Sequence, residues 1–262
     1  MRAVRGWRRA LPLIALAFIA GLSASIPQRE TIDIGVEDAA APWSQADGTG
    51  YANDLVRAAF DAVDVEVRLR VLPYARCKQH VLNGELVACV SMSPAPELRS
   101  AVRFSAEPLF VFTCQFFENP RSPLAKRIED FSRGMIVGIV MGYEYPADVM
   151  ARLKRRGVVL ESAPTEETNL RKLAAGRIDA AVVNMDVVKS SDWVAERAGV
   201  RGRVRPVFDV GRMPGYVGFS TVHPRGNAIA DRFDRGYARV IASGERERIQ
   251  RRWIARTTVH RP

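Results

Sequence analysis

Two short stretches of this chain carry nearly the same pattern, and this pattern decides the fold. Residues 82–92 read LNGELVACVSM, and residues 173–185 read LAAGRIDAAVVNM. In each, a leucine-bearing helical segment reaches a glycine, and a charged residue and a short apolar run follow. Glycine suits a helix end because the left-handed turn costs it least. An apolar run without full alternation is typical of a strand that is buried on both faces.

Each of these stretches ends a longer segment with the order strand–helix–strand–helix–strand, starting near residue 31 and again near residue 135. Such alternation predicts mainly parallel sheets with helices on both faces. We therefore expect an α/β protein with two lobes.

The N-terminus has the order of residues that is typical of a secretory signal. Four arginines without an acid precede the apolar run LPLIALAFIAGL, and the small residues Ser23, Ala24 and Ser25 follow. The run is shorter than the roughly 20 residues that span a bilayer, which disfavours the alternative of an uncleaved anchor. We therefore expect residues 1–25 to be a cleaved signal peptide and the mature protein to lie outside the cytoplasm.

Composition argues against several classes of function. The formal charge is +10, and it falls to +6 when the four arginines of the signal are removed (10 − 4). The remaining excess is spread along the chain without interleaved aromatic residues, which favours a basic solvated surface over a nucleic-acid groove. The three histidines have no cysteine or carboxylate at metal-ligand spacing, and no common catalytic motif is present. We expect no catalytic residue, metal or cofactor.

The three cysteines, Cys77, Cys89 and Cys114, are too few and too scattered to predict a disulfide framework. Export permits a disulfide. Cys89 and Cys114 both lie in predicted strands and could pair if these strands are neighbours. The alternative is that they are buried free thiols.

Polar residues follow both repeated strands, at the ends where open α/β sheets bind their ligands. Ser91 and Ser93 follow the first of these strands, and Asn184 and Asp186 follow the second. If the two sheets face each other, these side chains meet at one cleft. The alternative is that they only cap the next helices.

Five stretches, in the right order, resemble the periplasmic solute-binding proteins of ABC importers, in the polar amino-acid group called family 3 (type II fold). The first three stretches are APWSQADGTGYANDLVRAAFDAV, LPYARCKQHVLNGELVACVSMSPAPELRSAVRFSAEPLF and MIVGIVMGY. LAAGRIDAAVVNMDVV and YVGFSTVHPRGNAIADRFDRGYARVIASGERERIQRRW complete the set. The resemblance implies two lobes, with residues 26–114 and 215–262 in lobe one and residues 115–214 in lobe two, and a hinge of two crossing strands near residues 111–117 and 205–219. It also implies a monomeric periplasmic receptor that closes on a small solute and delivers it to a membrane permease.

The resemblance also implies roles for individual residues. Trp43 stands where an aromatic side chain packs on the ligand, and Ser93 and Arg99 stand where a hydroxyl and an arginine hold its carboxylate. Backbone N–H groups after Gly142 could share that charge. The secondary candidates for the cleft are Tyr74, Arg76, Tyr143 and Tyr145.

Two departures from the family pattern concern the ligand. Extra residues separate Ser93 from Arg99, and Asn184 stands where amino-acid binders have an aspartate for the ligand's ammonium group, a role that Asp186 could take if the strand is offset. We expect a small polar solute that carries a carboxylate, either an amino acid or a related organic anion. The alternatives are a dehydratase of the cyclohexadienyl type and a sensory protein without a transporter.

Overall fold

The computed structural model describes residues 29–123 and 127–258. The predicted signal peptide lies outside these residues. No helix within the described ranges is both long and apolar enough to cross a membrane.

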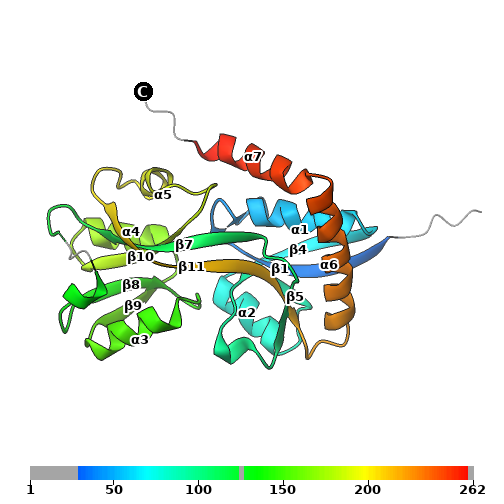
Figure 1. The fold of residues 1–262 in the computed structure, drawn as a ribbon, viewed down its shortest axis with the longest axis horizontal. Coiled ribbons are helices and arrows are strands. Elements are labelled where there is room, and N and C mark those ends of the chain that lie inside the picture. Colours follow the sequence, from blue (N-terminus) through cyan, green and yellow to red (C-terminus); the bar gives the residue numbers. More distant parts are fainter. Residues whose placement is uncertain (1–28, 124–126, 259–262) are drawn as a thin grey trace, which may run out of the picture.

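The first half of the structure is built on three parallel strands, β1 (Glu30–Glu37), β4 (Val65–Leu72) and β5 (Ala88–Met92). Strand β1 lies between the other two. Helices α1 (Tyr51–Asp61) and α2 (Tyr74–Leu82) cover opposite faces of this sheet (Figure 1). Gly84 follows α2 with a φ of 75°, so the glycine takes the left-handed conformation that the sequence predicts.

The second half repeats this arrangement with the parallel strands β8 (Ile136–Val140), β9 (Val159–Ala163) and β10 (Ala180–Met185). Its helices are α3 (Ala147–Arg155), α4 (Glu166–Ala174) and α5 (Ser191–Arg197). All six residues of β10 are buried, and Gly176 after α4 has a φ of 69°. Both repeated stretches therefore have the predicted helix–glycine–strand structure.

Two long antiparallel strands, β7 (Phe110–Glu118) and β11 (Arg205–Ser220), run through both halves (Figure 1). Strand β11 pairs with β5 and the short β6 (Val102–Phe104), and β7 pairs with β10. Hydrogen bonding is therefore continuous, in the order β4-β1-β5-β11-β7-β10-β8-β9, where the sequence led us to expect two separate sheets. Strands β7 and β11, which the sequence predicted to cross between the halves, make this connection. Together they pair with β5 of the first half and β10 of the second.

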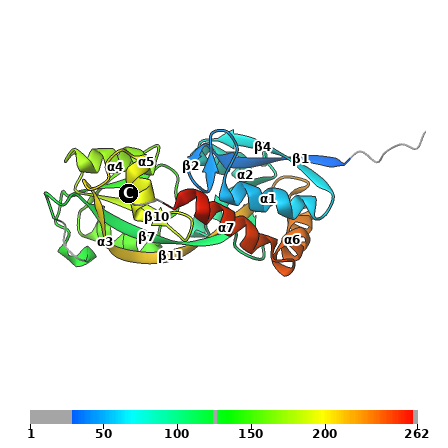
Figure 2. The same cartoon turned by 90° about the horizontal axis from the view of Figure 1, so that it is seen from above.

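The C-terminal helices α6 (Gly226–Ala242) and α7 (Glu245–Thr257) return to the first half and pack on α1. Helix α7 extends along α1 towards the second half (Figure 2). The remaining short elements are β2 (Ala39–Ala40), β3 (Ser44–Gln45) and the 3-10 helices η1 (Pro96–Leu98) and η2 (Ile128–Asp130).

The structure contains a disulfide between Cys77 of α2 and Cys89 of β5, with Cα atoms 5.9 Å apart. The considered pairing of Cys89 with Cys114 is wrong, because β11 lies between β5 and β7 in the sheet. Cys114 is a buried free thiol, and burial raises its pKa to about 12. Gly35 of β1 leaves room for the bridge, since a Cβ atom there would lie 2.4 Å from the Cys77 sulfur.

Candidate ligand-binding site

A small cavity lies between the two halves, where the carboxyl ends of their strands meet. Glu37 ends β1, Ser91 and Ser93 lie at the end of β5, and Asn184 lies near the end of β10. The other residues that line the cavity are Ala40, Trp43, Tyr74, Phe110, Phe112, Tyr143 and Glu144. Residues from both halves and from the crossing strand β7 thus face one space.

Hydrogen bonds connect the halves around this cavity. The Tyr143 hydroxyl donates to Glu37 Oε1 at 2.7 Å, and the Tyr74 hydroxyl donates to Glu144 Oε2 at 2.6 Å. Trp43 Nε1 donates to Asp186 Oδ2 at 2.9 Å. The cavity volume is about 20 Å³, which is room for about one water molecule. A solute can enter only if the halves separate or these side chains move.

Ser91 has an unusual backbone conformation at the edge of the cavity. Its φ is 66°, in the left-handed region that residues with a Cβ atom seldom occupy. It is the extra residue of a β-bulge, since Val90 pairs with Val217 and Met92 with Tyr216. Its Oγ is buried and has no hydrogen-bond partner among the described residues. Such strain and such an unpaired group are typical of ligand-binding positions.

Asn184 presents a second unpaired polar atom from the opposite half. The residue is 3% exposed, and its backbone N–H donates to Glu166 Oε1 at 2.7 Å. Its side-chain Oδ1 is buried without a hydrogen-bond partner among the described residues. An unpaired buried acceptor is costly, and a ligand that donates a hydrogen bond would remove this cost.

Acidic side chains dominate the electrostatics of the site. Glu37 is 4% exposed, and its burial raises its pKa from 4.5 to about 8. Burial also raises the pKa of Asp186 to about 6, and it raises that of Glu166 against the opposing effect of its buried ion pair with Lys189. Glu144 accepts a hydrogen bond from Lys78 Nζ at 2.8 Å.

The structure brings six of the nine predicted ligand-binding residues to the cavity: Trp43, Tyr74, Ser91, Ser93, Tyr143 and Asn184. Asp186 lies beside it, bonded to Trp43. The Ser93 hydroxyl donates to the carbonyl oxygen of Pro214, so it already has an acceptor.

Arg76 and Arg99 do not line the cavity, and both are exposed. Arg99 directly follows η1, and it is absent from the residues at the strand ends that line the cavity. The hydroxyl group of Tyr145, the other tyrosine after Gly142, accepts a hydrogen bond from the backbone N–H of Val140 at 2.8 Å.

Sequence reasoning missed the two carboxylates that line the cavity, Glu37 and Glu144. A signal for Glu37 was present, because it lies at the polar end of the first predicted strand, residues 31–38, and so at a carboxyl end. Phe110 and Phe112 were also missed, because their strand was interpreted only as a hinge. Glu144 lies in the loop after β8, and no pattern indicates where its side chain points.

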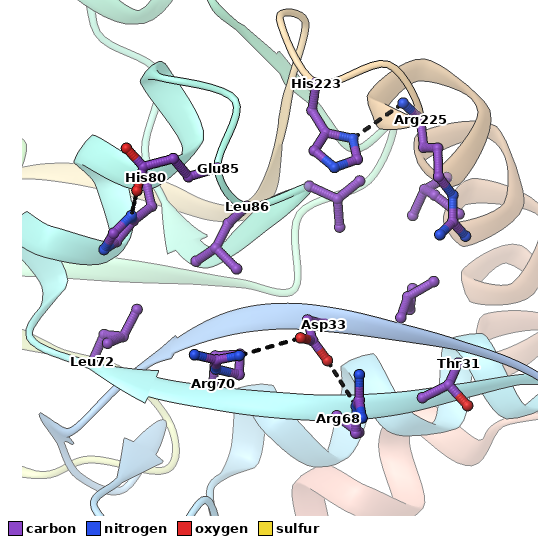
Figure 3. Close-up of a pocket in the computed structure, with 13 residues that line it drawn as sticks. Thr31, Asp33, Arg68, Arg70, Leu72, His80, Glu85, Leu86, His223 and Arg225 are labelled. Atoms are coloured by element: carbon purple, nitrogen blue, oxygen red, sulfur yellow. Dashed lines mark hydrogen bonds and ion pairs between the residues drawn. The ribbon is translucent and has the colours of Figure 1, made fainter.

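A second, larger cavity of about 450 Å³ lies on the first half alone (Figure 3). Asp33 bonds both Arg68, at 2.8 Å, and Arg70, at 3.3 Å, on one side of it, and His80 pairs with Glu85 on the other. These charged groups are exposed or partly exposed and already paired, so this cavity lacks the unpaired, buried polar atoms of the cavity between the halves. Among the described residues, no group of three His, Cys, Asp or Glu side chains could hold a metal ion.

Comparison with known protein families matches residues 32–256 to the bacterial extracellular solute-binding proteins, family 3. A search of curated proteins found no match.

Solved structures with a similar fold include a sensor domain and two amino-acid-binding proteins. A histidine kinase sensor domain with similarity to periplasmic binding proteins has a TM-score of 0.74 at 21% identity, over 86% of this chain and 96% of that chain. An ancestral arginine-binding protein bound to arginine has a TM-score of 0.73 at 19% identity, over 86% and 98%. The arginine-, lysine-, histidine-binding protein ArtJ from Geobacillus stearothermophilus has a TM-score of 0.71 at 17% identity, over 87% and 97%.

Proposed function

This chain belongs to the bacterial extracellular solute-binding proteins of family 3, and we propose that it is an exported receptor that closes a two-lobed cleft on a small polar solute. One observation carries the proposal: strand ends from both halves contribute side chains to a single buried cavity, and two of these side chains have unpaired polar atoms. A ligand held between Ser91 and Asn184 would contact both halves only when they are closed.

The proposed mechanism is hinge closure. Lobe one would comprise residues 26–114 and 215–262, lobe two residues 115–214, and the strands β7 and β11 would bend between them. A solute that contacts both lobes binds the closed form more tightly than the open form and so shifts the population towards it. The hydrogen bonds of Tyr143 to Glu37 and of Trp43 to Asp186 would break on opening.

We place the mature protein in the periplasm, as a monomer that delivers its solute to an ABC permease in the inner membrane, without turnover of the solute. The ligands named for the two amino-acid-binding relatives support a small polar solute. The expectation of a carboxylate on this solute rested on Arg99 and on the basic charge balance of the chain, and the position of Arg99 outside the cavity removes the first of these supports. The likeness to a sensor domain favours one second candidate, a solute-binding module that signals without import.

A pair of glycine variants tests hinge closure. A Cβ atom on Gly142 would lie 2.8 Å from the Cβ of Ala75 in the other half, so Gly142→Ala should hold the cleft open. Gly134 is the matched control, since its φ of 84° resembles the 85° of Gly142 but its Cβ would meet nothing within 4 Å. Both substitutions carry the same backbone strain, and only one blocks the cleft.

The experiment combines a thermal-shift screen of amino acids, organic acids and amines with small-angle scattering. We expect a hit to stabilise the wild type and the Gly134→Ala variant and to reduce their radius of gyration. The Gly142→Ala variant should have the larger radius and should lose binding. Equal binding and equal radii for the two variants would contradict hinge closure.

A further inference from the structure

We propose that the cleft recognises its solute through a cationic amine or guanidinium group and does not need a carboxylate on that solute. The inference rests on the proposed function, because it concerns the same cavity. It differs from the sequence-based expectation, which placed a carboxylate beside Arg99.

The side-chain donors that line the cavity are already engaged within the protein: Tyr74 donates to Glu144, Tyr143 donates to Glu37, and Trp43 and Ser93 donate to Asp186 and to the carbonyl oxygen of Pro214. Glu37 and Glu144 supply carboxyl groups, and Asn184 supplies an unpaired Oδ1. The unpaired Ser91 Oγ can either donate or accept. No lysine, arginine or histidine is among the described residues that line the cavity. An ammonium or guanidinium group carries only donors, so it complements this set, whereas a carboxylate would meet other acceptors.

The two lysines near the cavity are already engaged. Lys78 donates to Glu144 Oε1 and also bonds the carbonyl oxygen of Gly142. Lys189 is 2% exposed and forms its ion pair with Glu166. Two carboxyl groups, those of Glu37 and Asp186, remain without a basic side chain as partner in the described structure. A positively charged solute would supply the counter-charge that these two groups lack.

Aromatic rings form the walls of the same space. Trp43 stacks on Phe110 with ring centroids 4.9 Å apart, and Tyr74 meets Tyr143 edge to face at 5.3 Å. The ammonium group of Lys189 lies 4.3 Å from the centre of the Trp43 ring. Trp43 therefore already has a cation–π partner within the protein, and the aromatic walls offer the solute apolar surface for its carbon chain.

Proton exchange supports the geometry. Burial holds a proton on Glu37 at neutral pH, and the groups that face it are Tyr143, Glu166, Lys189 and Asp38. A cation bound beside Glu37 stabilises its ionised form and so lowers its pKa. Binding would then replace the proton of Glu37 with the cationic group of the solute.

The test uses matched probes, measured by calorimetry on the purified protein at pH 8. The panel contains aliphatic amines and guanidines of one to six carbons, including cadaverine and agmatine. L-lysine and L-arginine differ from these two only by a carboxylate, and glutarate is an anion of similar length. We expect at least one amine or guanidine to bind, with an affinity within about threefold of that of its amino acid or tighter, and we expect no binding of glutarate.

Three variants locate the binding. Glu37→Gln keeps the shape of the side chain and removes its ability to ionise. It should lower the affinity for the cation at least about tenfold. Glu85→Gln is the control on the exposed cavity of the first half and should leave the affinity unchanged. Asn184→Asp adds a carboxylate without added volume and should strengthen binding about tenfold.

Three results would overturn the inference: an amino acid that binds more than tenfold tighter than its amine, binding of glutarate, or a cation whose affinity does not respond to Glu37→Gln or Asn184→Asp. If an anion binds and Gly142→Ala abolishes its binding, the receptor function stands and the cation inference is wrong. If no compound of the panel or of the wider screen binds, both fail.

Discussion

Replacement of Glu37 by glutamine should stabilise the protein while it weakens solute binding. Glu37 is 4% exposed and keeps its proton up to a pKa of about 8, against 4.5 for an exposed glutamate. Glutamine has nearly the shape of the protonated side chain, and its oxygen can still accept the hydrogen bond of the Tyr143 hydroxyl. The substitution therefore removes the ionisation and little else.

The sign and size of the effect follow from the shifted pKa. Between pH 4.5 and 8 the unfolded chain has lost the proton of Glu37 while the folded protein retains it, so stability falls as pH rises, by about 1.4 kcal/mol per pH unit. Below pH 4.5 Glu37 is protonated in both states and does not lower the free energy of unfolding. Above pH 8 the decrease that it causes is complete. At pH 7 the accumulated cost is about 3 kcal/mol, which Glu37→Gln would recover.

Urea denaturation of the wild type and the variant at several pH values measures this difference. We expect the free energy of unfolding of Glu37→Gln to exceed that of the wild type by about 3 kcal/mol at pH 7, equivalent to a melting temperature about 6–12 °C higher. The difference should shrink towards zero near pH 4.5.

Glu85→Gln is again the matched control, because Glu85 is mostly exposed and should show no such gain. A Glu37→Gln variant that is no more stable than the wild type at pH 7, or a difference that does not depend on pH, would refute the reasoning. In either case Glu37 would have to be ionised in the folded protein, with a counter-charge that compensates its burial.

Three further predictions concern the site and its support. If a cation binds beside Glu37, calorimetry at pH 7 in phosphate and Tris buffers should report release of about one proton, and equal heats in both buffers would contradict this. The Cys77–Cys89 bridge has a sequence separation of 12, so its reduction should lower the free energy of unfolding by about 3 kcal/mol; a Cys77→Ala/Cys89→Ala variant should not respond to dithiothreitol. Ser91→Gly should raise that free energy by about 1 kcal/mol, because glycine tolerates the left-handed conformation, and it should weaken solute binding; a destabilised variant that binds normally would remove Ser91 from the site.

The sequence alone was sufficient to predict the local elements and their order. The glycines at 84 and 176, the apolar runs that follow them and the spacing of leucines all depend on short-range geometry, which the structure reproduces. The carboxyl ends of the repeated strands could be placed at a cleft for the same reason, since the polarity of parallel strands follows from their connections. This argument predicted Ser91 and Asn184 at a cleft, and both line the cavity.

Tertiary structure decided which distant residues meet. Cys89 pairs with Cys77 instead of Cys114 because β11 separates β5 from β7, and the order of strands in a sheet depends on contacts far apart in the chain. Arg99 is exposed and does not line the cavity, although its family pattern suggests a ligand contact. Burial raises the pKa of Glu37, and burial is a property of the assembled fold and not of the residues beside it in sequence.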